Sequence, residues 1–582
     1  MFKDYYLQEL QFLSELGEEF SRAHPGEAHL LSGPGRDPDV ERLMEGFAFL
    51  AGRVRQKLDD EFPELLHGLM NLISPHYLRP LPSMAILEFS PLLQALRQSQ
   101  RIARGTEVES VPVEGTPCRF RTAYDVLLSP VSLDQVTLET RASGLSVLCL
   151  DFRIWNKVRP EALQLDPLRL FLHGDPAATT ALYYHLCRHI EECWVGAPQR
   201  GGEPAAKRRL SLEPVGFKDE EALLPYPVSS FPGYRLLQEY FTLPERFLFV
   251  DLLGLGRLDE LGVEDRFRVE ICFDRALPAN LRPTREQIRL YCTPIVNLFG
   301  HEGDPIRIDR TQTEYRLRPS GRDPFHYEVF TVDRVTSFAS GAVEESEIPP
   351  FYSFSNGMDG ESTVSYSVRL RSSVADDRLD AYLAFSDPRG GPMLPDTETV
   401  ASQLTCTNRR RAEALRPGDI HVPTDSSPAF VQFRNLTAPT PSVAPPLEGD
   451  LHWRLLSHLS LNYLPLVSVE ALRGVLQLYN FQALGDARAA RANALRLEGI
   501  HQVRSEVSER LVRGAMLRGT AITVELLEDR FAGDGDLFLF AALLNELFGL
   551  SGTLNSFTQL TVRGAERGET IVWPPRIGRD RL

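Results

Sequence analysis

The sequence predicts an α+β protein of several domains, with an N-terminal helical bundle, β-rich middle domains and an α+β C-terminal domain. Three observations predict this class. The chain has 582 residues, which is too long for one ordinary hydrophobic core. Residues 2–75 carry apolar side chains at helical spacing, and short strand-like runs follow them. Beyond residue 450, helix-like and strand-like segments alternate.

The composition excludes several classes of function. An apolar content of 43% and a charged content of 24% are typical of folded, water-soluble proteins. The net charge of −16 would repel a phosphate backbone, so we expect no nucleic-acid partner. The seven cysteines are odd in number and form no C-x-x-C pair, which favours reduced thiols in a cytoplasmic protein.

We also expect no signal peptide and no direct insertion into a membrane. The N-terminus lacks the basic start and unbroken apolar core of a signal peptide. The most apolar run, residues 537–550, contains Asn545 and Glu546 and is too short to span a bilayer.

The region 1–80 reads as three helices. In the first, a stripe of large apolar side chains is wide enough to contact more than one neighbouring helix. It consists of Phe2, Tyr5, Tyr6, Leu10, Phe12, Leu13, Leu16 and Phe20.

The second helix begins after Asp37-Pro38, an N-cap followed by proline at the first helical position. We expect its apolar face to be buried. That face consists of Val40, Leu43, Met44, Phe47, Leu50, Ala51, Val54 and Leu58. Phe49 points the other way, among charged residues, and is either a partner contact or an ordinary exposed aromatic.

The third helix contains Glu64 and His67, an E-x-x-H pair like those that hold metal in di-iron bundles. Pro63 fits the first turn of this helix, and the pair falls opposite its leucine-rich face. Di-iron ligands must point into a bundle, and composition alone predicts roughly two such acid-x-x-His pairs. We therefore predict an ordinary helix start and not a metal site.

The remaining boundaries follow shifts in composition. We predict a β-rich domain over 81–222, with a helix near 176–195 and a flexible loop after it, and a second β-rich domain over 223–436. A proline-rich linker covers 437–450, and an α+β domain covers 451–582.

The sequence carries no nucleotide-binding, hydrolase or zinc-protease motif. His185, His189 and Cys193 share one face if their helix continues, but three ligands spread along one helix span about 12 Å and cannot share one ion. The alternative is a helix face with partly buried His and Cys. Asp251 and Asp274 are an equally weak acid–base pair. We predict no catalytic, cofactor-binding or metal site.

Eight segments together resemble the TssF (VasA/ImpG) family of type VI secretion system baseplate subunits, over essentially the whole chain. In order they are YYLQELQFLSELGEEFSRAHP, DPDVERLMEGFAFLAGRVRQKLDDEFPELLHGLMNLISPHYLRPLPSM, LRLFLHGDP, LLPYPVSSFPGYRLLQEYFTLPERFLFVDLLGL, YCTPIVNLF, QLTCTNR, LHWRLLSHLSLNYL and LNSFTQLTVR. The resemblance implies a structural protein and not an enzyme.

The resemblance also implies the partners. Two TssF copies would assemble with one TssG into a wedge, and six wedges would surround the spike and hub protein VgrG. TssK would connect the wedges to the inner-membrane complex, and TssE would connect them to the sheath. A related wedge protein of another phage-tail-like device is one alternative, and a cytosolic enzyme with a dispersed site is a more remote one.

By this resemblance the first helices join a bundle shared between chains. The expected contact residues are Tyr5, Tyr6, Leu10, Leu13, Leu16, Phe20, Phe49 and Val54. A further helix would present Trp453, His458, Asn462 and Tyr463. The alternatives are that the β-rich region of the same chain covers the first helix, and that the further helix packs into its own domain.

Overall fold

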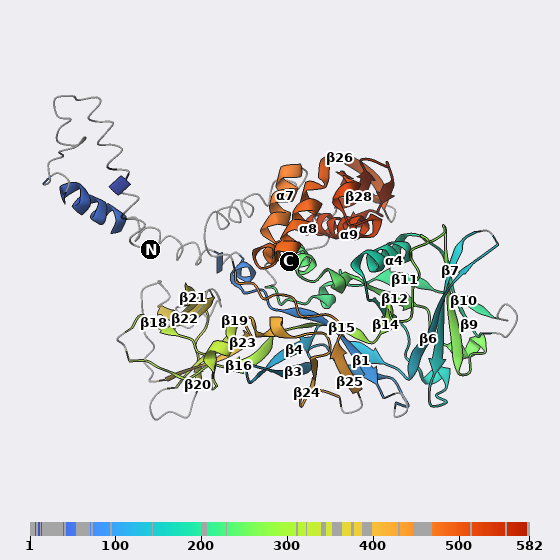
Figure 1. Cartoon of the computed structure of the whole chain (residues 1–582), viewed down its shortest axis with the longest axis horizontal. Helices are drawn as coiled ribbons and strands as arrows, with labels where there is room; N and C mark the ends of the chain where they lie inside the picture. Colours follow the sequence, from blue (N-terminus) through green and yellow to red (C-terminus); the bar gives the residue numbers. More distant parts are fainter. Residues whose placement is uncertain are drawn as a thin grey trace. The chain divides into compact units, whose positions relative to one another are not determined.

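The computed structural model divides the chain into two compact units (Figure 1). One comprises Met1–Leu78 with Leu447–His452, and the other comprises Arg79–Pro446 with Trp453–Leu582. The residues described are 6, 10, 11, 13, 39, 42–53, 70, 71, 74–92, 96–142, 144–198, 206–227, 230–309, 312–321, 323–338, 345–351, 364–373, 378–386, 399–428, 431–445, 468–512, 515–552 and 556–578. The described residues form helices and many strands, as expected for an α+β protein.

In the smaller unit, residues 42–53 form an α-helix, and residues 6, 10, 11 and 13 are also helical. A short 3-10 helix, η1 (Pro75–Leu78), follows. The division between the units falls two residues before the predicted boundary at residue 80.

The larger unit contains a six-stranded sheet built from three distant parts of the chain. In spatial order its strands are β24 (Ile420–Pro423), β3 (Glu107–Val113), β4 (Thr116–Thr122), β15 (Cys292–Val296), β1 (Met84–Pro91) and β25 (Val431–Asn435). β1 lies antiparallel to both neighbours, with Met84 opposite Val296 and Phe89 opposite Phe433. The first six residues of β1 are all buried, as expected for a central strand covered on both faces.

Two further sheets also combine strands from before and after residue 222. One has the order β10 (Lys207–Arg209), β9 (Ile190–Gly196), β13 (Arg266–Phe273), β7 (Ser146–Ile154) and β6 (Val131–Thr140). The other has the order β11 (Ser211–Pro214), β12 (Phe249–Leu253), β8 (Leu168–Leu172) and β14 (Ile288–Leu290). The predicted division between 81–222 and 223–436 is therefore wrong, because backbone hydrogen bonds join strands from both sides of it in three sheets.

The helix expected near 176–195 is shorter than predicted. α4 (Pro176–Arg188) starts at Pro176, and the Asp175 side chain accepts hydrogen bonds from the backbone N–H groups of Ala177 and Ala178. It ends at Arg188 because the following residues pair with β13 as strand β9. A second helix, α5 (Pro232–Thr242), has all of its residues buried after Pro232.

Residues beyond β15 build two smaller sheets around a common apolar core. One consists of β16 (Phe299–Glu302), β23 (Thr399–Thr407), β19 (Glu328–Phe338) and β20 (Glu345–Glu347), with β17 (Ile306–Arg307) paired to β23. The other consists of β18 (Glu314–Arg316), β22 (Leu379–Ser386) and β21 (Ser365–Ser372). The two strands β2 (Gln100–Ile102) and β5 (Val126–Leu128) form a separate pair.

The first part of the predicted linker 437–450 is held against β1. The Thr440 N–H donates to the Met84 carbonyl at 2.8 Å, and Leu81 and Val443 exchange two backbone hydrogen bonds. Val443 is 5% exposed. These residues thus extend the packed unit, which corrects the linker prediction for residues 437–445.

Residues 468–578 form a sheet covered by helices. The strands, in order, are β26 (Ile500–Val512), β27 (Ala515–Leu526), β28 (Ser556–Gly564) and β29 (Thr570–Val572), with β30 (Arg576–Ile577) paired to β28. The helices are α7 (Val469–Leu478), α8 (Ala487–Glu498) and α9 (Asp534–Ser551). β27 and β28 are parallel, and α9 is the crossover between them.

The helix α9 joins this sheet to the rest of the larger unit. It contacts α4, α5 and β28, and its residues from Gly535 to Asn545 are all buried, as expected for an apolar helix inside a protein (Figure 1). Of the helices that the structure describes, none is long and apolar enough to cross a membrane.

Short 3-10 helices connect these elements: η2 (Pro160–Ala162), η3 (Asp219–Glu221), η4 (Pro244–Phe247), η5 (Leu258–Leu261), η6 (Pro324–His326), η7 (Arg411–Ala414), η8 (Phe481–Leu484) and η9 (Glu528–Arg530).

Candidate functional site

The helix 42–53 exposes large apolar side chains. Leu43, Phe47 and Leu50 are 76%, 62% and 64% exposed. Their i, i+4, i+7 spacing places them on one face. The buried positions on the same helix are the small residues Ala48 and Gly52. The expectation that Leu43, Phe47 and Leu50 are buried within the chain is therefore wrong. We call these three residues the apolar helix face.

Such a face is typical of a surface that another protein covers, because water contact with clustered large apolar side chains is unfavourable. Phe49 is 50% exposed, on another side of the helix. Among the other predicted contact residues, Tyr6, Leu10 and Leu13 are partly buried. Those outside the described residues are Tyr5, Leu16, Phe20, Val54, Trp453, His458, Asn462 and Tyr463.

The histidine and cysteine candidates do not form a metal site. Cys193 lies in strand β9 and not on the helix that carries His185, so the expected common face does not exist. The His189 Nδ1 atom lies 3.1 Å from Asp274 Oδ1, and the rings of His185 and His189 are 5.5 Å apart. Burial lowers the pKa of His185 to about 4 and raises the pKa of the Cys193 thiol to about 12. Within the part of the chain that the structure describes, no three His, Cys, Asp or Glu side chains are grouped to hold a metal ion.

The acidic candidates have other partners. Arg169 donates two hydrogen bonds to Asp251, both 2.8 Å long, so that carboxylate is one half of a bidentate ion pair. Asp274 accompanies His189. Glu64 and His67 lie outside the described residues.

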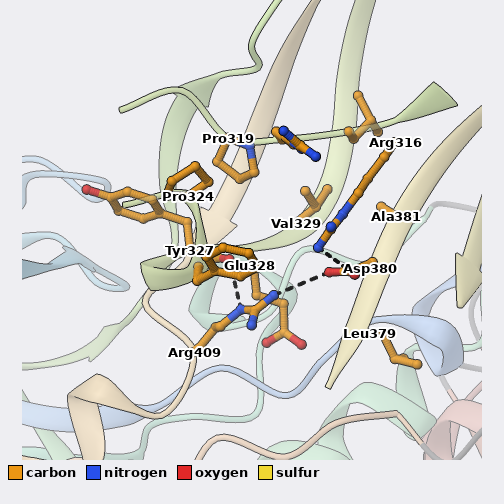
Figure 2. A pocket seen from close by; sticks show the side chains of 13 residues that line it. Arg316, Pro319, Pro324, Tyr327, Glu328, Val329, Leu379, Asp380, Ala381 and Arg409 are labelled. Atoms are coloured by element: carbon orange, nitrogen blue, oxygen red, sulfur yellow. Dashed lines mark hydrogen bonds and ion pairs between the residues drawn. The ribbon is translucent and has the colours of Figure 1, made fainter. Parts of the chain in front are cut away.

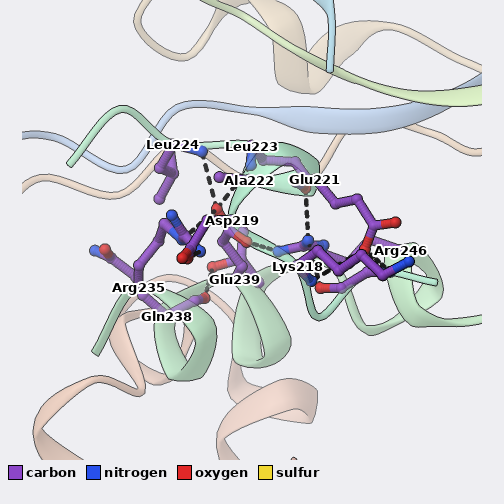
Figure 3. A network of polar contacts seen from close by, with 12 residues as sticks. Lys218, Asp219, Glu221, Ala222, Leu223, Leu224, Arg235, Gln238, Glu239 and Arg246 are labelled. Atoms are coloured by element: carbon purple, nitrogen blue, oxygen red, sulfur yellow. Dashed lines mark hydrogen bonds and ion pairs between the residues drawn. The ribbon is translucent and has the colours of Figure 1, made fainter. Parts of the chain in front are cut away.

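A buried polar network holds the segment 216–224 against α5 (Figure 3). Glu239, on α5, is fully buried and accepts hydrogen bonds from the Leu223 and Leu224 N–H groups at 2.8 and 2.9 Å. The Arg246 guanidinium forms an ion pair with Glu239 and donates to the Gly216 and Glu221 carbonyls, both at 2.7 Å. The charged groups of Glu239 and Arg246 therefore hold the backbone of residues 216, 221, 223 and 224 in place.

The charges of this network are compensated by one another and by backbone carbonyl groups. Arg246 is 1% exposed, and burial lowers the pKa of its guanidinium. Its charge is compensated by Glu239 and by the two carbonyls. Arg235, also on α5, donates to Asp219 at 2.9 Å and so ties η3 to the same helix. Glu239 and Asp219 thus each pair with an arginine of the network.

A second buried junction joins β15, β4 and the end of β23. The Asn297 side chain donates to the Asn408 Oδ1 atom at 2.8 Å and accepts from the Asn408 N–H at 2.7 Å. Asn297 also donates to the Arg119 carbonyl at 2.6 Å. These two amides therefore lock the six-stranded sheet to its neighbour.

One cavity of about 280 Å³ lies among β18, β19, β22 and η6 (Figure 2). Its wall includes Arg316 and Arg409, which both face the buried carboxylate of Asp380, at 2.6 and 3.6 Å. Proline, aromatic and aliphatic side chains supply most of the rest of the wall, together with Arg318 and Glu328. This arrangement is that of a small binding pocket with a cationic side.

Sequence reasoning did not single out Glu239, Arg246, Asn297 or Asn408. A signal was present for two of them, because Asn297 is the only polar residue of the run PIVNLF, and Glu239 follows Gln238 inside the largely apolar run LLQEYF. A polar residue in such a run is buried and needs a partner, but the sequence does not name that partner.

Comparisons with known proteins agree along nearly the whole chain. The family model described as "Type VI secretion system, TssF" matches residues 1–580. A curated relative, "Type VI secretion system component TssF1" of Pseudomonas aeruginosa, is 33% identical, with 99% of this chain and 98% of the relative covered.

Two solved structures are also similar. A chain of the type VI secretion system TssK-TssF-TssG baseplate subcomplex, from cryo-electron microscopy, has 33% identity and a TM-score of 0.76, covering 92% of this chain and 99% of that one. A chain of the baseplate complex from the type VI secretion system has 30% identity and a TM-score of 0.65, with both chains fully covered.

Proposed function

The chain belongs to the TssF family of type VI secretion systems, whose members are structural baseplate components, and from this premise we propose that it builds the baseplate wedge, with two copies bound to one TssG. The proposal assigns it no catalytic step. Its contribution is to hold other proteins in a fixed arrangement.

The apolar helix face is the observation that carries the proposal. Leu43, Phe47 and Leu50 are exposed on one side of a helix whose small residues are buried. Large apolar side chains in this arrangement are the usual anchors of a helix that packs against helices of another chain. In this proposal residues 1–80 supply helices to a bundle shared by two copies of the chain and TssG.

The other predicted contacts fit the same scheme. Tyr5, Tyr6, Leu10, Leu13, Leu16, Phe20, Phe49 and Val54 would contribute to the shared bundle. Trp453, His458, Asn462 and Tyr463 would form a second contact. The β-rich regions and the α+β C-terminal region would form the body that faces TssK, TssE and the spike protein VgrG. We place the assembled wedge in the cytoplasm, docked to the inner-membrane complex.

The mechanism that follows relies on rigid bodies and exchangeable interfaces. The Glu239–Arg246 network and the Asn297–Asn408 pair hold the larger unit together through buried hydrogen bonds. Interfaces between such bodies can switch between two arrangements without bond chemistry. Contraction would begin when the interfaces of the ring rearrange together.

Co-expression of the full chain with TssG from the same gene cluster tests the proposal. Size-exclusion chromatography with light scattering should give the mass of two copies plus one TssG. A chain that stays monomeric beside a folded TssG would contradict the proposal.

Two variants locate the contact. Phe47→Glu places a charge on the apolar helix face and should abolish the complex, while Leu13→Asp should do the same from the first helix. Glu161→Lys, at an exposed glutamate of the larger unit and outside residues 1–80, is the charge-reversal control and should assemble normally. Circular dichroism of each variant should match that of the unmodified chain.

A further inference from the structure

The pocket of Figure 2 has rigid walls. β18, β19 and β22 belong to the two sheets that share an apolar core, and Leu317, Leu383 and Phe385 of that core are at most 3% exposed. The Arg409 Nε atom donates to the Tyr327 carbonyl at 2.9 Å, which fixes the turn after β23 beneath the pocket. The cavity is therefore preformed and does not need an occupant to shape it.

The charges of the pocket are unevenly compensated. Asp380 is approached by both Arg316 and Arg409, and Glu328, on the wall, lies 3.7 Å from Arg378. Arg318, at the exposed side, has no ion pair from its guanidinium to any residue that the structure describes. One arginine at the mouth is thus available to an incoming anion, although the whole chain has a net charge of −16.

The mouth also carries an exposed aromatic ring. Phe325 is 51% exposed, and the Arg316 guanidinium lies over its ring, 5.7 Å from the centroid. Pro319 and Pro324 also line the pocket (Figure 2). An exposed aromatic ring next to arginines and prolines has the composition of a protein-binding hot spot.

We propose that this pocket binds an acidic segment of another protein, with one apolar side chain in the cavity and a neighbouring carboxylate paired with Arg318. A peptide segment fits better than a free small molecule for two reasons. The volume of about 280 Å³ lies at the lower end of the usual range for small-molecule sites and is enough for one large side chain. The exposed ring of Phe325 extends the apolar surface outside the cavity, where a continuing chain would lie.

This inference does not rest on the proposed function. The pocket residues belong to Arg79–Pro446, whereas the shared bundle uses residues 1–80. A failure to assemble with TssG would therefore contradict the proposed function, and a failure to bind the acidic segment would contradict only this inference.

The first test is selection of a random heptapeptide library displayed on phage against the full chain. We expect enrichment of sequences in which Phe, Trp or Leu adjoins Asp or Glu. The best sequence, made as a fluorescein-labelled synthetic peptide, is then titrated with the full chain by fluorescence anisotropy. Failure to enrich any motif, or enrichment of basic motifs, overturns the proposal.

Variants connect binding to the pocket. Arg318→Glu should lower the affinity for the peptide by about tenfold or more, and Phe325→Ser should lower it by a similar factor. Arg318→Lys should retain most of the affinity because it keeps the charge. Arg282→Glu, the same change at an exposed arginine between β13 and β14, should have no effect.

Salt gives an independent reading. Raising the ionic strength to about 1 M shortens the screening length to about 3 Å and should weaken an arginine–carboxylate contact. Equal binding to the unmodified chain and Arg318→Glu, or binding that is insensitive to salt, means that the peptide docks elsewhere and the proposal is wrong.

Discussion

Single residues matter most where a charge is buried. Glu239 and Arg246 are both almost completely inaccessible, and together they hold the backbone of residues 216, 221, 223 and 224. Removing one member of such a pair leaves the other charge without compensation in a low-dielectric interior. The pair is therefore a point at which one substitution affects several elements.

We expect Glu239→Gln to destabilise the protein by about 3 kcal/mol or more, because the buried Arg246 guanidinium loses its ion-pair partner. The midpoint of urea unfolding, followed by tryptophan fluorescence, measures this effect. Arg334→Gln is the control, since Arg334 and Glu347 form an exposed pair that should contribute less than about 1 kcal/mol. Equal shifts of the urea midpoint in the two variants would show that the buried pair contributes no more to stability than the exposed pair.

The two buried histidines predict a loss of stability in acid. Burial lowers the pKa of His185 to about 4, and burial also lowers that of His189. The unfolded chain takes up these protons near the ordinary histidine pKa of about 6.5, so below that pH the unfolded state binds more protons than the folded one. This part of the stability is complete above about pH 6.5 and decreases as the pH falls towards 4.

Urea midpoints measured from pH 7.5 to 4.5 test this dependence. The midpoint should fall most steeply below about pH 6.5. His185→Gln removes one titrating ring and should flatten the slope, whereas His421→Gln, at an exposed histidine, should leave it unchanged. A His185→Gln slope equal to that of the unmodified chain would contradict the assignment.

Among the elements, α9 approaches the backbone of the distant helix α4 very closely. A Cβ atom on Gly535 would lie 2.2 Å from the carbonyl carbon of Thr180, so α4 and α9 approach here with no room for a side chain. Phe538 lies beside Tyr183 and Tyr184 on α4, with ring centroids 6.1 and 5.2 Å apart. The contact depends on a glycine at this position.

We expect Gly535→Ala to destabilise the protein by about 1–3 kcal/mol, because the helices must separate or shift to admit one methyl group. Thermal unfolding measures the change. Gly300→Ala is a matched control, since a Cβ at Gly300 meets no atom within 4 Å. If both variants unfold at the same temperature, the close packing of α4 and α9 is not important for stability.

The sequence predicts some elements better than others, for physical reasons. The α+β alternation expected beyond residue 450 is present, and the apolar run 537–550 lies within the helix α9. The helix near 176–195 was predicted too long, because helical spacing from His185 to Cys193 continues while pairing with β13 overrides it. The apolar face of helix 42–53 was identified correctly, but its environment could not be, since a sequence does not distinguish a core from a partner.

At the scale of the whole molecule, strand pairing was the least predictable feature. The residues 196–222 read as a flexible boundary, yet β10 and β11 within them pair with β9 and β12. Which strands become neighbours depends on long-range contacts that local patterns do not encode. Short strands far apart in sequence therefore pair within common sheets, where the composition suggested two separate β-rich domains, 81–222 and 223–436.

This organisation predicts how the chain tolerates truncation. A chain of residues 79–582 retains every sheet of the larger unit, so we expect it to be soluble and to unfold at nearly the same urea midpoint as the full chain. It lacks the apolar helix face, so it should not assemble with TssG. Light scattering of the co-expressed pair checks the second expectation.

A chain of residues 79–446 tests the effect of removing the C-terminal region instead of the N-terminal one. It lacks α9, so the faces of α4 and α5 that contact Phe538 and Phe540 would be exposed to water. Newly exposed apolar surface of this kind favours aggregation, and we expect this fragment to be insoluble or to bind a hydrophobic dye strongly. A soluble, cooperatively folding 79–446 fragment would show that the C-terminal helices and sheet are an independent domain, and that α9 does not hold the larger unit together.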